Sequence, residues 1–248
     1  MDTISLPKVY FITGAGISAE SGVPTFRGEN GLWNDFDIDE ICNIHTFKQN
    51  HDKVNQFYRQ YYDMLKNIEP NHAHRIIGKL QQRYGSDRVK VITTNVDDLH
   101  ERGGATDVLH VHGDIRYKIQ DFFGDSKVVP VECDDPVTEG TYSKPAVVFF
   151  GESVRYTSDG VKHQLYDELY ETLDNINSHD IVIVIGASFQ VVPFHYLLGS
   201  CPAYKININI EDDCFTNSCF NSVLVDGATL GLQKCKNFIE TTMEGKNV

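Results

Sequence analysis

Three polar side chains with the potential for chemistry directly follow apolar runs of this 248-residue sequence. Asn95 and Asp97 come after the run 89–93, and His112 follows the run 108–111. Ligands bind at the carboxyl ends of the strands in a doubly wound sheet, so Asn95 and Asp97 are predicted to face one. His112, followed by glycine, is predicted to be a general base, because the unperturbed pKa of histidine, about 6.5, lies near working pH. Capping of the next helix by Asn95 is the alternative interpretation.

The same region allows a second chemistry. His110, His112 and Asp114 have the alternating spacing of a metal hydrolase, with two imidazoles on one face of a strand and a carboxylate beyond them. Ile115 stands where the common form of that motif has another histidine, and the histidines at 163, 179 and 195 have no comparable cluster around them. Metal hydrolysis is therefore the minor alternative, and no metal site is predicted.

A glycine-rich loop at 14–19 follows the first apolar run immediately and has the pattern G-x-G-x-x-A. Main-chain amides and a helix N-terminus bind a pyrophosphate in this pattern, so a nucleotide is favoured over a structural turn. Gly22 and Pro24 end the helix too early for the βαβ unit of a hydride-transferring dehydrogenase. The next segment carries a guanidinium and two rings that could close over a ligand, or pair and pack locally: Phe26, Arg27 and Trp33.

These side chains must be positioned by an alternation of apolar runs and helical segments. The runs predict an α/β fold of the Rossmann-like, doubly wound type, whose parallel strands lie at 9–13, 89–93, 108–111, 146–150, 181–185 and 206–210. Apolar spacing predicts a helix with one buried stripe made of Val54, Phe57, Tyr58, Tyr61 and Leu65. A second helix is predicted from an Asn71 N-cap to Gly85, and a third over 161–176.

Two stretches, 22–46 and 115–145, do not fit this alternation and predict a small second lobe. We expect one domain over 1–248. Its large lobe is expected to comprise 1–22, 71–114 and 146–248, and its small lobe 23–70 and 115–145.

Composition limits the partners. Asp and Glu number 35 against 22 Lys and Arg, a net charge of −13, so direct nucleic-acid binding is not expected and a cationic partner is weakly favoured. No apolar run is long enough to span a bilayer, and we expect a cytoplasmic, non-membrane protein, a monomer by default. The six cysteines are scattered without a C-x-x-C pair, which fits neither a disulfide framework nor a tetracysteine zinc site.

Seven blocks, in order, resemble the signature motifs of the sirtuin family of NAD-dependent protein deacylases: GAGISAESGVPTFRG, GLW, TNVDDLH, HVHGD, KPAVVFFGE, IVIGASFQVVP and INIE. The resemblance covers about residues 8–230. It implies a Rossmann-like lobe, a small lobe, NAD in the cleft between them, and an acyl-lysine protein or peptide as substrate. It also implies that the acyl oxygen attacks the nicotinamide ribose as nicotinamide leaves, and that the acyl group ends on ADP-ribose.

Carried over residue by residue, the resemblance makes His112 the general base, with Asn95 and Asp97 lining the nicotinamide pocket. It implies NAD contacts at Gly14, Ala15, Gly16, Ala19, Glu20, Phe26, Arg27, Trp33, Thr94, Gly186, Ser188, Asn209, Glu211 and Ala228. A substrate peptide is implied to add as a strand between two segments, with substrate contacts at Tyr58, Tyr61, Phe150, Gly151, Glu152 and Val191.

The sequence departs from the family pattern in several places. Structural zinc in the family is held by two cysteine pairs, whereas 115–145 contains only Cys133, so the small lobe is expected to be zinc-free. Thr94 stands where most family members have glutamine, and its shorter side chain is expected to lose one contact with the cofactor.

The dipeptides Ala19-Glu20 and Phe57-Tyr58 resemble the class III members, which remove acidic acyl groups. Tyr61, however, stands where that subclass has an arginine, and a phenol cannot form a bidentate charged clamp. Acetyl or a longer apolar acyl group is at least as plausible, and core packing of both tyrosines is the alternative.

The sequence therefore predicts an enzyme, an NAD-dependent protein-lysine deacylase. NAD glycohydrolase or ADP-ribosyltransferase activity is the first alternative, and a non-catalytic NAD or ADP-ribose binding module is the second.

Overall fold

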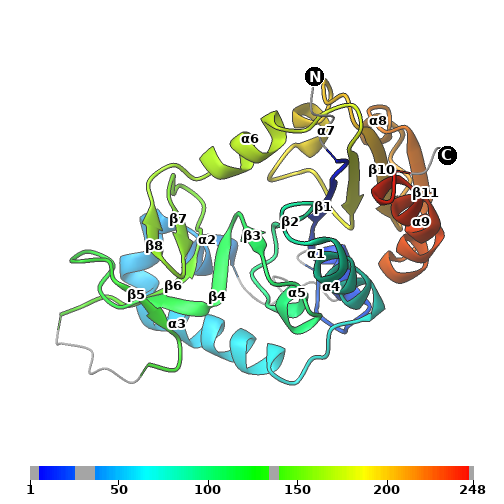
Figure 1. Ribbon diagram of the computed structural model, residues 1–248. Helices are drawn as coiled ribbons and strands as arrows, with labels where there is room; N and C mark the ends of the chain where they lie inside the picture. Colours follow the sequence, from blue (N-terminus) through cyan, green and yellow to red (C-terminus); the bar gives the residue numbers. More distant parts are fainter. Residues whose placement is uncertain (1–5, 26–36, 134–139, 246–248) are drawn as a thin grey trace.

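The computed structural model describes residues 6–25, 37–133 and 140–245, and its centre is a six-stranded parallel sheet (Figure 1). The strand order is β11-β10-β9-β1-β2-β3. The strands are β1 (Val9–Thr13), β2 (Val89–Thr93), β3 (Val108–His110), β9 (Ile181–Ile185), β10 (Tyr204–Asn209) and β11 (Ser222–Val225). Five of the six predicted runs thus form strands of this sheet, and β11 was not predicted.

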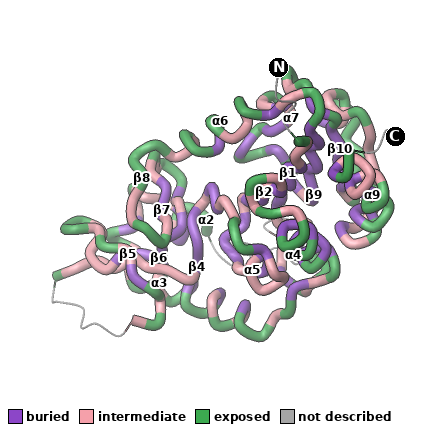
Figure 2. Tube along the Cα trace, in the orientation of Figure 1, coloured by how far each residue is buried: buried purple, intermediate pink, exposed green. Residues whose placement is uncertain are grey.

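Helices cover both faces of the sheet, as the doubly wound prediction requires. On one face, α4 (His72–Tyr84) and α9 (Ala228–Met243) pack on the odd-numbered side chains of β1 and β9. On the other, α6 (Asp167–Asp174) and α7 (Phe194–Leu197) contact the even-numbered ones. Figure 2 shows the central strands buried and the outer face of α6 exposed. Strands buried on both faces explain why their sequences are continuously apolar.

The second predicted helix begins and ends as expected. The Asn71 side chain accepts hydrogen bonds from the main-chain N–H groups of Ala73 and His74, and Gly85 ends α4 with a φ of 86°. Such a positive φ favours glycine.

A small lobe lies beside the large sheet. It contains α2 (Ile38–Ile41), α3 (Ile44–Leu65), a three-stranded antiparallel sheet in the order β5-β4-β6, and the hairpin β7-β8 (Figure 1). Its strands are β4 (Gly113–Ile119), β5 (Val128–Pro130), β6 (Lys144–Val147), β7 (Arg155–Thr157) and β8 (Gly160–Lys162). The predicted stripe of α3 is confirmed, because Val54, Phe57, Tyr58, Tyr61 and Leu65 are all buried in one cluster with Phe149.

Two predictions about elements are wrong. The run 146–150 does not enter the large sheet, because β6 pairs antiparallel with β4 in the small one. An apolar run shows that a strand is buried but not which sheet buries it. The helix predicted over 161–176 begins only at Asp167, since the preceding residues form the β7-β8 hairpin, whose turn ends at Gly160 with a φ of 129°.

Within the described residues, none of the helices combines the length and apolar character that crossing a membrane requires. The short helices α1 (Ala15–Ala19), α5 (Leu99–Arg102) and α8 (Cys214–Asn217) follow strands of the large sheet. The first two carry or adjoin the residues of the predicted site.

Candidate active site

Close glycine contacts bring the loops after β1 and β9 together. Gly14 donates from its main chain to the Ile185 carbonyl at 3.0 Å, and Gly16 donates to the Gly186 carbonyl at 2.9 Å. A Cβ on Gly14 would lie 2.7 Å from the Gly186 oxygen, and one on Gly16 only 2.6 Å from the Gly186 Cα. Side chains at these positions would collide with the main chain of Gly186, so glycine is needed for the two loops to pack this closely. The predicted glycines therefore meet at the carboxyl edge of the sheet, as a pyrophosphate-binding loop requires.

Asn95 and Asp97 lie beside this loop and share a partner, Ser18. The Asn95 amide donates to the Gly14 carbonyl and to Ser18 Oγ, both at 3.2 Å, and Ser18 Oγ donates to Asp97 Oδ2 at 3.0 Å. Asn95 Oδ1 is buried and has no partner among the described residues. Buried polar atoms are normally paired, so this oxygen fits a ligand that donates a hydrogen bond.

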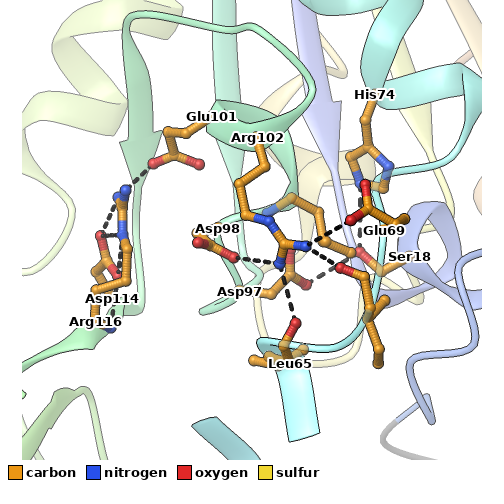
Figure 3. Close-up of polar contacts among 12 residues, drawn as sticks. Ser18, Leu65, Glu69, His74, Asp97, Asp98, Glu101, Arg102, Asp114 and Arg116 are labelled. Carbon is orange, nitrogen blue, oxygen red and sulfur yellow. Dashed lines mark hydrogen bonds and ion pairs between the residues drawn. The ribbon is translucent and has the colours of Figure 1, made fainter. Parts of the chain in front are cut away.

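Asp97 is almost fully buried, and burial raises its pKa to about 6, although the Leu99 main chain and Ser18 donate to its two oxygens. The carboxylate is thus still mostly ionised at neutral pH and can accept further hydrogen bonds. His74, on α4, lies behind Ser18 with its Nε2 at 3.5 Å from Ser18 Oγ (Figure 3). Sequence reasoning did not assign Ser18 or His74. The position of Ser18, one turn into the glycine-loop helix, was the available signal.

A small cavity joins these groups. It is lined by Ala15, Ser18, Val23, Pro24, Tyr61, Asn95, Val96 and Asp97. The predicted cofactor residue Ala15 and the predicted pair Asn95 and Asp97 are thus assembled around one space. Tyr61 shares it, which places this ring beside Asp97.

His112 lies in the turn between β3 and β4, where the chain leaves the large sheet for the small lobe. Its carbonyl accepts from the Val148 main chain at 2.9 Å, and its Nε2 lies 3.4 Å from the Tyr166 hydroxyl. Burial lowers the pKa of His112 to about 4, against a smaller opposing effect of a hydrogen bond to the Thr94 main chain. The ring is therefore neutral at physiological pH and able to accept a proton, as the general-base prediction requires.

His110 belongs to a different cluster. Its Nδ1 is 3.0 Å from the Asn95 carbonyl and its Nε2 is 3.0 Å from Glu101. Among the described residues, Glu101, His110 and Asp114 form the one group whose geometry could suit a metal, and His112 is not part of it. Arg116 pairs with both carboxylates of this group (Figure 3). The guanidinium supplies the positive charge there, and the hydrolase motif of His110 and His112 is not assembled.

The His110 pair makes stability depend on pH. Burial would lower the pKa of His110, but Glu101, Asp114 and the Asn95 carbonyl raise it to about 9, while His110 and Arg116 outweigh burial of Glu101 and lower its pKa to about 2. Because its pKa is higher in the folded protein, protonated His110 stabilises the fold fully below about pH 6.5. This stabilisation is lost as pH rises through about 9. The Glu101 contribution is present above about 4.5, so both act together near pH 5–6.

We expect a His110→Gln variant to lose up to about 3 kcal/mol of unfolding free energy at pH 6 and much less at pH 10. Urea unfolding of both proteins at the two pH values measures this difference. A deficit of equal size at both values would contradict the charged state of His110.

The predicted cofactor residues of the C-terminal half lie at or just beyond the ends of β9, β10 and β11, and Asn209 is the last residue of β10. Asn209 donates from its side chain to the Ala187 carbonyl at 3.0 Å, and Ser188 and Glu211 are exposed. Ala228 is the first residue of α9, and Glu20 accepts from the Thr229 main chain at 3.1 Å, so it ties α1 to that helix.

The other predicted cofactor residues have varied surroundings. The Thr94 hydroxyl donates to the Thr13 carbonyl at 3.3 Å, a bond that joins the ends of β1 and β2. Ala19 is exposed at the end of α1. Phe26, Arg27 and Trp33 lie outside the described residues.

The predicted peptide-binding segments expose two apolar side chains, Phe150 at 50% and Val191 at 52%. Gly151 has a φ of 88°. The Glu152 carboxylate is not available there, because it pairs with buried Lys144 at 3.2 Å inside the small lobe. Tyr58 is likewise in the lobe core, hydrogen-bonded to Cys42 and stacked on Phe149, so its core-packing alternative describes its surroundings.

Comparisons with known proteins agree with this geometry. Residues 14–193 match the Sir2 family. An NAD-dependent protein deacylase of Aggregatibacter actinomycetemcomitans is 38% identical over 200 residues, covering 79% of this chain and 88% of the relative. A protein of the same name from Campylobacter jejuni strain RM1221 is 32% identical over 98% of this chain and 100% of its own length.

Solved structures show the same fold. A serine-to-alanine mutant of a Sir2 homologue, bound to ADP-ribose, has a TM-score of 0.78 at 28% identity, covering 97% of this chain and 95% of the other. A Sir2 homologue in complex with NAD has a TM-score of 0.76 at 28% identity, covering 95% and 90%. Because the family match spans residues 14–193 and these relatives share the chain's length and Rossmann-like fold, this chain belongs to the Sir2 family.

Proposed function

We propose that this protein is an enzyme that uses NAD to remove acyl groups from lysine side chains of proteins or peptides. The observation that carries the proposal is the meeting of Asn95, Asp97 and the glycine cradle at one sheet edge, with neutral His112 in the turn at the same edge. The names of the relatives and the NAD and ADP-ribose complexes of solved homologues support it.

The side chains have separable tasks. NAD supplies a ribose carbon that becomes electrophilic when nicotinamide leaves, and the acyl group ends on ADP-ribose. Two acceptors are available to hold the amide group of nicotinamide. They are the Asp97 carboxylate and Asn95 Oδ1, which lacks a protein partner among the described residues. The cavity is small and its polar groups are buried, so it limits water that would otherwise intercept the reacting carbon. Nε2 of His112 then accepts the proton of a ribose hydroxyl.

The acyl group is proposed to be acetyl or a longer apolar chain. Tyr58 and Tyr61 are both buried, and burial raises the pKa of both phenols, so neither carries charge. Arg59, the adjacent guanidinium, is about half exposed and pairs with Asp63 at 3.1 Å. Without a guanidinium beside these tyrosines, an acyl carboxylate would lack a charged partner.

One incubation separates the candidate functions. The protein, NAD and a panel of acetyl-, myristoyl- and succinyl-lysine peptides are incubated and analysed by mass spectrometry. O-acyl-ADP-ribose with free lysine is the expected product, in larger amount from the uncharged acyl peptides than from succinyl-lysine. Nicotinamide released equally without peptide would indicate a glycohydrolase, and binding without turnover would indicate a binding module. Turnover that ignores NAD and is abolished by a chelator would indicate a metal hydrolase.

The small lobe is proposed to fold without structural zinc. Cys133 is the only cysteine in 115–145, and the lobe core is instead an aromatic cluster in which Phe47 lies 5.7 Å from Phe122 and 5.9 Å from Phe149 between ring centroids. These residues do not fit a tetracysteine site.

We therefore expect purified protein to contain well below about 0.1 zinc per chain and to keep its unfolding midpoint after chelator treatment. Elemental analysis by mass spectrometry and thermal unfolding with and without chelator measure this. A stoichiometric zinc that is lost together with stability would overturn the proposal.

A further inference from the structure

A tyrosine from another part of the chain contacts the predicted base. The Tyr166 hydroxyl lies 3.4 Å from His112 Nε2, and the two ring centroids are 6.3 Å apart. Tyr166 is the residue just before α6, separated from His112 by 54 positions in the sequence. Because Nε2 is the nitrogen assigned to proton transfer, a hydroxyl at this distance bears directly on the chemistry.

The fold holds Tyr166 in place through a buried arginine. Arg155, in β7 and 4% exposed, donates to the His110 carbonyl at 3.3 Å and pairs with Glu168 of α6. The main chain of Leu165 also donates to the Ser153 carbonyl at 3.0 Å. One side chain thus connects the end of β3, two residues before His112, to the first turn of α6, so the position of Tyr166 relative to the base is structurally determined.

The contacts of His112 also indicate where its proton lies. Nε2 faces the Tyr166 hydroxyl at 3.4 Å, and the Thr94 main chain raises the pKa of the ring, as a nearby carbonyl does. We therefore assign the proton of the neutral ring to Nδ1. Nε2 then carries the lone pair, and the Tyr166 hydroxyl is its donor. Within the described part of the chain, no charged side chain shifts the pKa of His112.

We propose that Tyr166 is a positioning residue for His112, which orients Nε2 in the neutral base and accepts a hydrogen bond from Nε2–H after proton transfer. This inference rests on the proposed deacylation. In the step itself, the Tyr166 hydroxyl first turns its proton away from Nε2 and frees the lone pair. The ribose O–H bond then breaks, the Nε2–H bond forms, and the ribose oxygen keeps the electron pair for its attack on the acyl carbon. The Tyr166 oxygen then accepts from Nε2–H and is not ionised. Burial raises the pKa of this phenol, which favours the neutral form.

The Tyr166 hydroxyl is expected to raise the pKa of His112. A hydrogen bond to an ionised partner is roughly twice as strong as one between neutral groups. Tyr166 therefore stabilises the imidazolium more than the neutral ring, which makes His112 a stronger base than burial alone would leave it. Removing the hydroxyl should lower both the pKa of His112 and the rate of the step that uses it.

The test compares Tyr166→Phe with Tyr170→Phe. Tyr170 lies in the first turns of α6 with its ring centroid 5.9 Å from that of Tyr166 and is 46% exposed, whereas the ring and hydroxyl that contact His112 belong to Tyr166. Two rates are measured with the acyl-lysine peptide that the wild type uses best: incorporation of labelled nicotinamide into NAD, which precedes the base, and formation of O-acyl-ADP-ribose. Tyr166→Phe should keep exchange within about twofold and lower product formation about tenfold, while Tyr170→Phe changes neither.

A readout independent of activity completes the test. In ¹⁵N-labelled protein, the His112 ring signals of the wild type should report the Nδ1–H tautomer, and Tyr166→Phe should lower the His112 pKa and mix the tautomers. Unchanged ring signals would overturn the proposal, as would equal losses of exchange and product formation, which indicate a merely structural role. If wild type shows no deacylation, the proposed function fails, and the ring signals still decide the Tyr166–His112 contact.

Discussion

A His112→Ala variant is expected to form O-acyl-ADP-ribose about 10²–10⁴ times more slowly than wild type, while labelled nicotinamide still exchanges into NAD. The reason is the separation of tasks in the site. Asn95, Asp97 and Ser18 form one hydrogen-bonded group beside the glycine cradle, whereas His112 lies in the turn after β3 with its own partners. Removing the imidazole therefore deletes the proton acceptor and leaves the amide-binding group intact.

The measurement is the ratio of exchange to product formation, taken at saturating NAD and peptide. His163→Ala is the matched control, because His163 is an exposed histidine after the β7-β8 hairpin. This control should match wild type in both rates. Full product formation by His112→Ala would show that another group takes the proton, and loss of exchange along with product would show that the variant damages the pocket.

Breaking the buried Lys144–Glu152 pair is expected to cost about 3–5 kcal/mol of unfolding free energy. The side chains are 0% and 3% exposed, and the Lys144 ammonium lies 3.7 Å from the centre of the Phe149 ring. Glu152 also accepts from the Tyr156 hydroxyl at 2.6 Å and from the Phe149 main chain at 2.7 Å. A Glu152→Gln variant keeps the volume but leaves the ammonium in a low-dielectric core without its counter-charge.

Urea unfolding with linear extrapolation measures the loss. Asp63→Asn is the control, since the Arg59–Asp63 pair is about half exposed and should contribute no more than about 1 kcal/mol. A Lys144→Met, Glu152→Gln double variant should recover most of the loss, because it removes the unpaired charge as well. A loss below about 1 kcal/mol in Glu152→Gln alone would show that water reaches this pair.

The small lobe shows that a residue's role cannot always be assigned from its place in a family motif. The block KPAVVFFGE predicts a peptide-binding segment, and Phe150 in it is exposed. Glu152 was assigned to substrate from the same block, yet its carboxylate lies inside the lobe with Lys144. A motif preserves residue types in order, whereas the direction of each side chain depends on what packs against it.

The surroundings of the two tyrosines considered for acyl preference could not be predicted from the sequence either. Tyr58 and Tyr61 lie on one helical stripe, which the sequence periodicity correctly predicted. Their surroundings differ nevertheless: Tyr58 stacks on Phe149 at 5.6 Å, while Tyr61 lines the cavity beside Asp97. Periodicity assigns a face of a helix but not the neighbour that covers each turn of it.

The sequence by itself predicted five of the six strands of the large sheet, the N-cap of α4 and the glycine loop, and it singled out Asn95, Asp97 and His112. These features depend on local patterns: buried parallel strands need continuous apolar runs, and phosphate-binding turns need glycine. Only the tertiary structure decided which side chains meet. Ser18 bonds to Asp97 across 79 positions, Arg116 pairs with both Glu101 and Asp114, and Tyr166 reaches His112. Such contacts depend on how distant elements pack, because hydrogen bonds and ion pairs act over a few ångströms of space and not along the chain.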